Sequence, residues 1–205
     1  MNDRNIKDLG AQVGKELKTQ VTILGGFVAI IWIVQIINAV IFRGYLAQFG
    51  IIPLHIVGLR GIFLAPFLHG NFAHVAANTL PFLILGWLVI IRGVGEFFFV
   101  SVFAALIAGI GTWLIGGSNT VHVGASGMIF GYFGYLLLRG VFERNVISIV
   151  ISVIVGITYG SLIFGVAPTE AGVSWQGHLF GFIGGAIAAK LLANQKKSDR
   201  SDRQY

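Results

Sequence analysis

The feature that most constrains the fold is a series of six apolar runs, most of them long enough to cross a lipid bilayer. A helix needs about 20 residues to span the hydrocarbon core. Only 11% of the 205 residues are charged, against about 25% in soluble domains. We therefore predict an all-α integral membrane protein with six transmembrane helices, over residues 21–42, 72–91, 97–115, 124–138, 146–166 and 173–193. The fourth run is short, so its start should lie below the membrane surface.

The polar residues divide the chain into three parts. Residues 1–20 form a cytoplasmic tail, in which apolar residues at helical spacing predict a short amphipathic surface helix. Residues 21–193 form the six-helix domain. Residues 194–205 are polar, and we expect a disordered cytoplasmic tail.

The longest connection covers residues 43–71. It contains Pro53 and Pro66, which interrupt helices, yet it is too apolar for a free loop. Irregular backbone at membrane depth is tolerated only where protein or a water-filled cavity covers it. We expect an interfacial or partly inserted segment packed against the helices.

Lysine and arginine are distributed unevenly between the two ends of the predicted bundle. Six spans place both termini on one side, where twelve of these residues lie, against Arg43 and Arg60 on the other. Cytoplasmic segments carry the excess of positive charge, so both termini should be cytoplasmic. The net charge of +6 then reflects orientation and anionic lipid headgroups rather than nucleic-acid binding. With no cleavable signal peptide visible, we expect a multi-pass protein of the cell membrane, in particular a bacterial plasma membrane.

A serine stands among small residues at the start of the fourth run, in the stretch 123–131. Ser126 has two interpretations. Membrane helices use Gly, Ala and Ser for close packing, and a serine on a crowded turn can also be a nucleophile.

Three other polar residues share the depth of this serine. His74 and Asn78 lie early in the second run and share one helix face, and His178 lies early in the sixth. Singly, a histidine can be structural and an asparagine can bond neighbouring helices. Together with Ser126 they form one layer on three helices that start from the same side. A serine near a histidine is the nucleophile and base of acyl transfer, and neighbouring donors can stabilise an oxyanion.

The sequence offers no obvious acid for a third triad member. None of the eight acidic residues lies within a predicted span, and only Glu170 lies on the outer side. We therefore expect a Ser126/His178 dyad whose imidazole is oriented by neighbours other than a carboxylate.

Glycines lie on the two helices that carry this dyad. Gly181 and Gly185 are four residues apart in the sixth run, and Gly127, Gly131 and Gly134 follow Ser126 in the fourth. If these two faces meet, the backbones approach closely enough for Ser126 and His178 to hydrogen-bond.

At these residues the chain resembles the rhomboid family of intramembrane serine proteases. The resemblance covers roughly residues 21–193 and rests on three motifs in order on the second, fourth and sixth runs. They are the histidine and asparagine of 74–78, the G-x-S-G of 124–127, and the histidine-glycine helix of 177–185.

The resemblance implies a role for each motif residue. Ser126 would be the nucleophile and His178 the general base and acid. His74, Asn78 and the Ser126 backbone N–H would form the oxyanion hole. Site-shaping residues would be Gly124, Gly127, Phe130 and Gly181.

The loops and the fifth run also gain expected roles. Residues 43–71 would be the membrane-embedded first loop, held in part by His69. The fifth run would be a lateral gate for transmembrane protein substrates, and residues 167–172 would cap the site. No metal or cofactor is implied, and the oligomeric state is not indicated.

Two departures from the family pattern stand out. Many members have a tyrosine where this chain has Phe130, which keeps a stacking surface and loses the hydroxyl. The tryptophan-arginine pair of the first loop is absent, and Leu59-Arg60 is the nearest match.

Two other functions compete with the protease. A catalytically inactive membrane chaperone or trafficking factor could use the same scaffold, although such relatives usually lack Ser126 or His178 equivalents. A small channel or transporter would need polar residues along the full depth of a span, and here they stop within the first turns.

Overall fold

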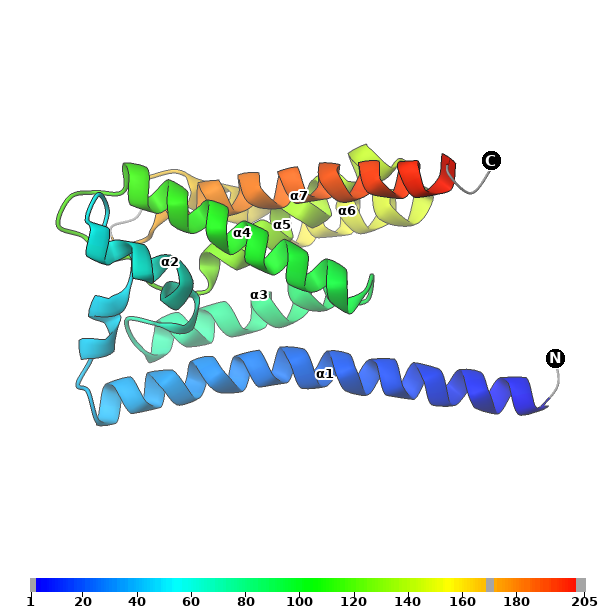
Figure 1. Ribbon diagram of the computed structural model, residues 1–205, viewed down its shortest axis with the longest axis horizontal. Helices are drawn as coiled ribbons and strands as arrows, with labels where there is room; N and C mark the ends of the chain where they lie inside the picture. The colour runs from blue at the N-terminus through cyan, green and yellow to red at the C-terminus, as the bar shows by residue number, and fades with distance from the viewer. Residues whose placement is uncertain (1–2, 169–171, 202–205) are drawn as a thin grey trace.

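The computed structural model describes residues 3–168 and 172–201, which form an almost entirely helical bundle (Figure 1). The α-helices are α1 (Asp3–Val40), α2 (Gly61–Leu64), α3 (Phe72–Ile90), α4 (Val94–Ile115), α5 (Ser126–Glu143), α6 (Val146–Tyr159) and α7 (Trp175–Ser201). The 3₁₀ segments are η1 (Tyr45–Phe49), η2 (Ile56–Arg60), η3 (Ala65–Phe67) and η4 (Gly160–Val166). Within these described residues, strand-like pairing is limited to an isolated bridge between Ile51 and His122.

Four helical segments are long and apolar enough to cross a membrane. They cover Asp8–Val40, Phe72–Ile90, Val94–Ile115 and Val146–Val166. The remaining two expected spans, α5 and α7, are long enough, with 18 and 27 residues, but less apolar than these four. Both carry glycines and polar residues, which the bundle interior accepts because neighbouring helices replace lipid there. In α5 the whole stretch from Met128 to Leu136 is buried.

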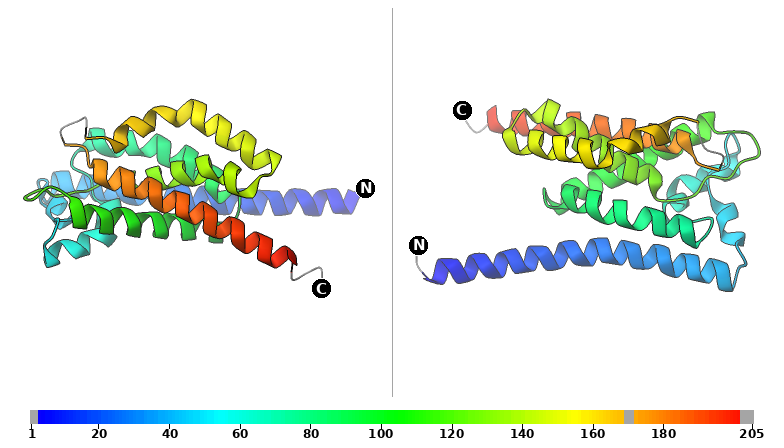
Figure 2. Two further views of the ribbon diagram at one scale, coloured as in Figure 1. Left: turned by 90° about the horizontal axis from the view of Figure 1, so that it is seen from above. Right: turned by 180° about the vertical axis from the view of Figure 1, so that it is seen from behind.

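α5 is the central helix of the bundle. It packs against α3, α4, α6 and α7, and its apolar side chains join those of α3 and α4 in one core. α4 and α6 lie on opposite edges of the bundle (Figure 2, left). α1 runs along the outside and packs mainly on α3 (Figure 1).

The ends of the chain are more helical than the sequence suggested. α1 is one continuous helix from Asp3, so no separate surface helix precedes the first span. Its 38 residues correspond to a length of about 57 Å. The expected disordered tail is also partly wrong, because α7 continues to Ser201. Both extensions contain several Lys, Arg and Gln residues, which favour helix.

The segment between α1 and α3 folds into η1, η2, α2 and η3 and packs against α4. It lies at the end of the bundle opposite to the start of α1 and the end of α7 (Figure 1). We call this the site end and the opposite end the far end. The backbone of Ile51 pairs with that of His122 through two hydrogen bonds of 2.9 Å, which joins this segment to the α4–α5 loop.

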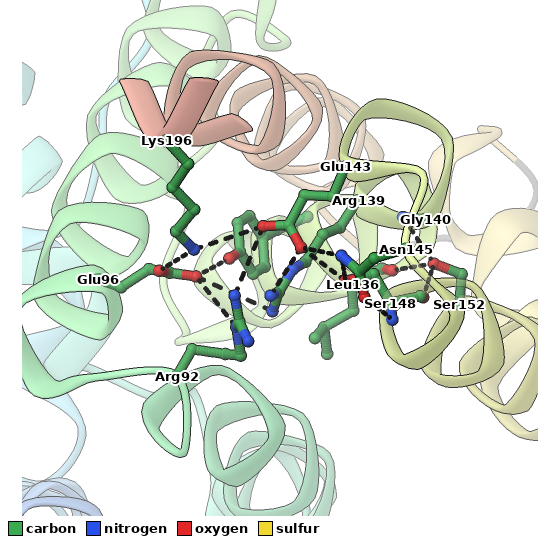
Figure 3. A network of polar contacts seen from close by, with 11 residues as sticks. Arg92, Glu96, Leu136, Arg139, Gly140, Glu143, Asn145, Ser148, Ser152 and Lys196 are labelled. Atoms are coloured by element: carbon green, nitrogen blue, oxygen red, sulfur yellow. Dashed lines mark hydrogen bonds and ion pairs between the residues drawn. The ribbon is translucent and has the colours of Figure 1, made fainter. Parts of the chain in front are cut away.

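The far end holds a partly buried cluster of charges (Figure 3). Glu96 of α4 and Glu143 of α5 both accept from Lys196 of α7, at 2.9 and 3.4 Å. Arg139 is 2% exposed and bonds Glu143 at 3.0 Å. α4 and α5 extend beyond the predicted spans 97–115 and 124–138, and these extensions include two acidic residues. Glu96 and Glu143 lie inside α4 and α5, with side chains 10% and 7% exposed.

Candidate active site

The start of α3 positions His74 and Asn78. Asn71 caps the helix, and its side chain accepts from the backbone N–H of His74 at 2.8 Å. The Asn78 amide donates to the carbonyl of His74 at 2.8 Å, one turn earlier. A side-chain amide carries two N–H donors, so one remains for a ligand. His74 and Asn78 lie one turn apart on the same face of α3, and both line the cavity that Ser126 of α5 also lines.

Ser126 is the first residue of α5. The chain reaches it through Gly124, whose φ of +119° is a conformation that residues with a side chain rarely adopt. A Cβ on Gly124 would lie 2.7 Å from Nε2 of His74 and 3.8 Å from Oγ of Ser126. Because Gly124 has no side chain, the side chains of His74 and Ser126 can both lie close to its backbone. The first N–H groups of a helix lack intrahelical partners and favour negative charge.

His178 lies in the first turn of α7 and is held by two contacts. Its ring stacks on Phe130 with the ring centres 4.0 Å apart and the planes at 6°. Its Nδ1 lies 2.8 Å from the carbonyl oxygen of Gly165 in η4. A carbonyl oxygen only accepts, so Nδ1–H is the donor.

One cavity of about 550 Å³ brings these side chains together. Its lining includes His74, Asn78, Ser126, Phe130 and His178. Between these described residues, Ser126 and His178 make no direct hydrogen bond, which differs from our expectation. The imidazole is held by Phe130 and Gly165 instead, and catalytic hydrogen bonds are often loose before substrate binds.

The glycine faces of α5 and α7 do meet. A Cβ on Gly181 would collide with the backbone carbonyl of Gly127, and one on Gly185 with that of Gly131. Only hydrogen can occupy these positions at the present helix separation. The close approach brings the start of α5, with Ser126, beside the start of α7, with His178.

Two further histidines support the site. His69 is 1% exposed, its ring meets that of His74 edge-on at 5.0 Å, and burial lowers its pKa to about 4. His122 lines the cavity, and its ring bonds Ser174 at 2.7 Å and Thr120 at 2.8 Å. Burial also lowers the pKa of His122. No role for His122 can be predicted from the sequence, because its partners come together only in the folded chain.

Gly165 was also missed. Its contact with His178 is made by a backbone carbonyl, which no side-chain pattern can reveal. The acid nearest in sequence, Glu170, lies outside the described residues. Within residues 3–168 and 172–201, no carboxylate is hydrogen-bonded to His178, and Glu96 and Glu143 lie at the far end.

Comparison with known proteins gives a consistent assignment. The Rhomboid domain family matches residues 56–195. The uncharacterized protein Rv1337 of Mycobacterium tuberculosis (strain ATCC 25618 / H37Rv) is 41% identical over 183 residues, covering 85% of this chain and 76% of the relative. The uncharacterized protein ML1171 of Mycobacterium leprae (strain TN) is 41% identical over 189 residues, covering 88% and 74%.

A more distant relative carries a functional name. The protein named "Putative rhomboid protease YdcA" of Bacillus subtilis (strain 168) is 31% identical over 131 residues, covering 63% of this chain and 65% of the relative. The family match covers more than half of the chain and includes the residues around the cavity from α3, α5 and α7. The chain therefore belongs to the rhomboid family.

Proposed function

We propose that this chain is an intramembrane serine endopeptidase that cleaves transmembrane protein substrates near the extracytoplasmic membrane face. The observation that supports this most directly is the shared cavity. It gathers Ser126, His178, His74 and Asn78 from three helices at one end of the bundle. A potential nucleophile, base and pair of donors around one space is the set that acyl transfer requires.

The proposed reaction uses these groups in two halves. Oγ of Ser126 attacks the scissile carbonyl carbon while His178 takes the hydroxyl proton at Nε2. The carbonyl π electrons move to oxygen, and the oxyanion accepts from His74, Asn78 and the Ser126 backbone N–H. The intermediate then collapses, the C–N bond breaks, and the proton on Nε2 passes to the leaving amine.

Water completes the cycle. It attacks the acyl-enzyme carbon and gives a proton to His178, and the new intermediate expels Oγ of Ser126, which recovers its proton. The products are a carboxylic acid and the free enzyme. Every proton step uses side chains of this chain.

The proposed topology has six crossings, with α5 and α7 added to the four apolar spans. Twelve Lys and Arg residues lie on the side of the termini and two on the other side. This difference supports a cytoplasmic location for the far end and for both termini. The cavity then opens toward the extracytoplasmic face. α6 and η4, which are largely exposed, would form the lateral gate for a substrate helix.

The experiment compares wild type with Ser126→Ala, His178→Ala and Ser118→Ala. Ser118 is an exposed serine in the α4–α5 loop and serves as the matched control. A purified, labelled transmembrane substrate should be cleaved by wild type and Ser118→Ala only. A fluorophosphonate probe should label the same two proteins and leave Ser126→Ala unlabelled.

Equal cleavage by wild type and Ser126→Ala would contradict the proposal. Absence of both cleavage and probe labelling in folded wild-type protein would favour the inactive chaperone or trafficking factor. The channel alternative has less support, because the buried stretch of α5 below the site consists of apolar and aromatic residues and glycines.

A further inference from the structure

The imidazole of His178 has an unusual partner for a catalytic base. In a serine triad, a carboxylate holds the imidazole in the tautomer whose free nitrogen faces the serine. The carboxylate bonds the other ring nitrogen, Nδ1. Here, within the described part of the chain, Nδ1 of His178 instead bonds the backbone oxygen of Gly165 at 2.8 Å. Gly165 belongs to η4, thirteen residues before His178 and on a different element.

We propose that the Gly165 carbonyl is the positioning group that replaces the acid of a triad. The inference rests on the proposed protease function and specifies how its base is prepared. A carbonyl oxygen has no proton to give, so the bond fixes the proton of neutral His178 on Nδ1. Nε2 then carries the lone pair that receives the proton of Ser126, while the Nδ1 proton stays in place throughout.

Two contacts together fix the ring. Phe130 lies flat against it at 4.0 Å and sets the ring plane. The Gly165 oxygen sets the rotation within that plane, because only one ring nitrogen can meet it. Neither contact alone fixes both, so the pair does for His178 what a buried carboxylate does in other serine proteases.

The approach of this carbonyl requires a residue without a side chain. A Cβ on Gly165 would lie 2.9 Å from Cζ of Phe130 and 3.3 Å from Nδ1 of His178. Both distances are shorter than ordinary carbon contacts, so either η4 or the stacked pair would have to move. Glycine is used here for close backbone approach.

The position of Gly165 also links the base to the gate. η4 continues α6, and the side chains of Ile163 and Phe164 beside it are 41% and 73% exposed. Outward movement of η4 would carry the acceptor away from Nδ1. The base is therefore in its active tautomer only while η4 lies against Phe130 and His178.

The tautomer can be read directly from the wild-type protein. We would label histidine with ¹⁵N and record spectra in detergent at pH 8, identifying the His178 signals by their loss in His178→Ala. The expected pattern is a protonated, hydrogen-bonded Nδ1 and an unprotonated Nε2. A neutral His178 protonated on Nε2 would overturn the inference.

A matched pair of glycine variants tests the consequence for catalysis. Gly165→Ala should lower kcat roughly 10- to 100-fold, part of the contribution of a general base, with little change in KM. Its His178 spectrum should shift toward protonated Nε2. Gly26→Ala in α1, outside both the cavity lining and the proposed gate, has no atom within 4 Å of the new Cβ, and it should leave both readouts unchanged.

The outcomes separate this inference from the proposed function. Wild type that neither cleaves nor reacts with the fluorophosphonate probe would refute the protease, while the spectrum would still report the tautomer. Gly165→Ala with wild-type kcat and an unchanged spectrum would refute the positioning role in an active protease. Should Gly165→Ala fail to fold, the wild-type spectrum alone decides.

Discussion

Asn78 shows how a single side chain can serve both the fold and the site. One N–H of its amide bonds the His74 carbonyl at 2.8 Å and steadies the first turns of α3. Its side chain is buried, with 5% of the residue exposed, yet it borders the cavity beside Ser126. A second N–H on the same nitrogen is therefore available where an oxyanion would form. We expect its contribution to appear in the transition state rather than in substrate binding.

The variant Asn78→Ala tests this expectation. Loss of one oxyanion donor lowers kcat by about 10²–10³ in a well-studied serine protease, and we expect a loss of this order with KM nearly unchanged. Steady-state cleavage of the labelled substrate gives both constants. The control is Thr79→Val on the same helix, because Thr79 bonds Trp32 of α1 at 3.0 Å rather than the cavity. Equal kcat values for the two variants would exclude Asn78 from the oxyanion hole.

At the scale of helices, the sequence predicted the parts of the fold that depend on side-chain pattern. The sequence showed glycine faces on α5 and α7 that could meet, and they do meet, because small residues four apart allow two helix backbones to approach closely. The layer of His74, Asn78, Ser126 and His178 follows from three helices that begin at the same end. Their convergence on one cavity needed only helix length and direction.

Other features could not be predicted, for identifiable physical reasons. Gly165 acts through its backbone, so its residue type gives no signal. Arg139 and Glu143 look like charges that end a span, because burial depends on Glu96 and Lys196 arriving from distant helices. The continuity of α1 was missed because its first half is polar and its second half is apolar. Such a change in composition does not reveal that the backbone remains one helix.

The variant Gly181→Ala tests the close packing of α5 and α7. The new Cβ would meet the Gly127 carbonyl, and overpacking of this kind costs about 1–3 kcal/mol. We expect a lower melting temperature in detergent together with reduced cleavage, because Ser126 and His178 lie at this interface. Gly25→Ala in α1 is the control, since no atom lies within 4 Å of its Cβ. Similar losses in both variants would argue against a packing role specific to Gly181.

The whole molecule separates two polar regions by an apolar middle. The site end holds the cavity with its histidines, and the far end holds the cluster of Arg92, Glu96, Arg139, Glu143 and Lys196 (Figure 3). The cluster joins the ends of α4, α5 and α7. A buried charge that loses its partner costs about 3–5 kcal/mol, so the cluster resists sliding of these helices. Such sliding would also move Ser126 relative to His178.

This separation of polar ends gives a prediction for how the chain crosses the membrane. The chain has no cysteine, so single cysteines can be introduced without background. Ser118→Cys and Arg144→Cys flank α5 at opposite ends, and Lys15→Cys lies near the start of α1; all three positions are exposed. In intact bacteria, a membrane-impermeant maleimide should label Ser118→Cys alone, and Arg144→Cys and Lys15→Cys should be labelled only after the cells are opened. The reason is that α5, although less apolar than the four clear spans, is surrounded by protein, and we expect the excess of positive charge to keep the far end in the cytoplasm. Labelling of Ser118→Cys and Arg144→Cys from the same side would mean that α5 does not cross, and labelling of Lys15→Cys in intact cells would invert the proposed orientation.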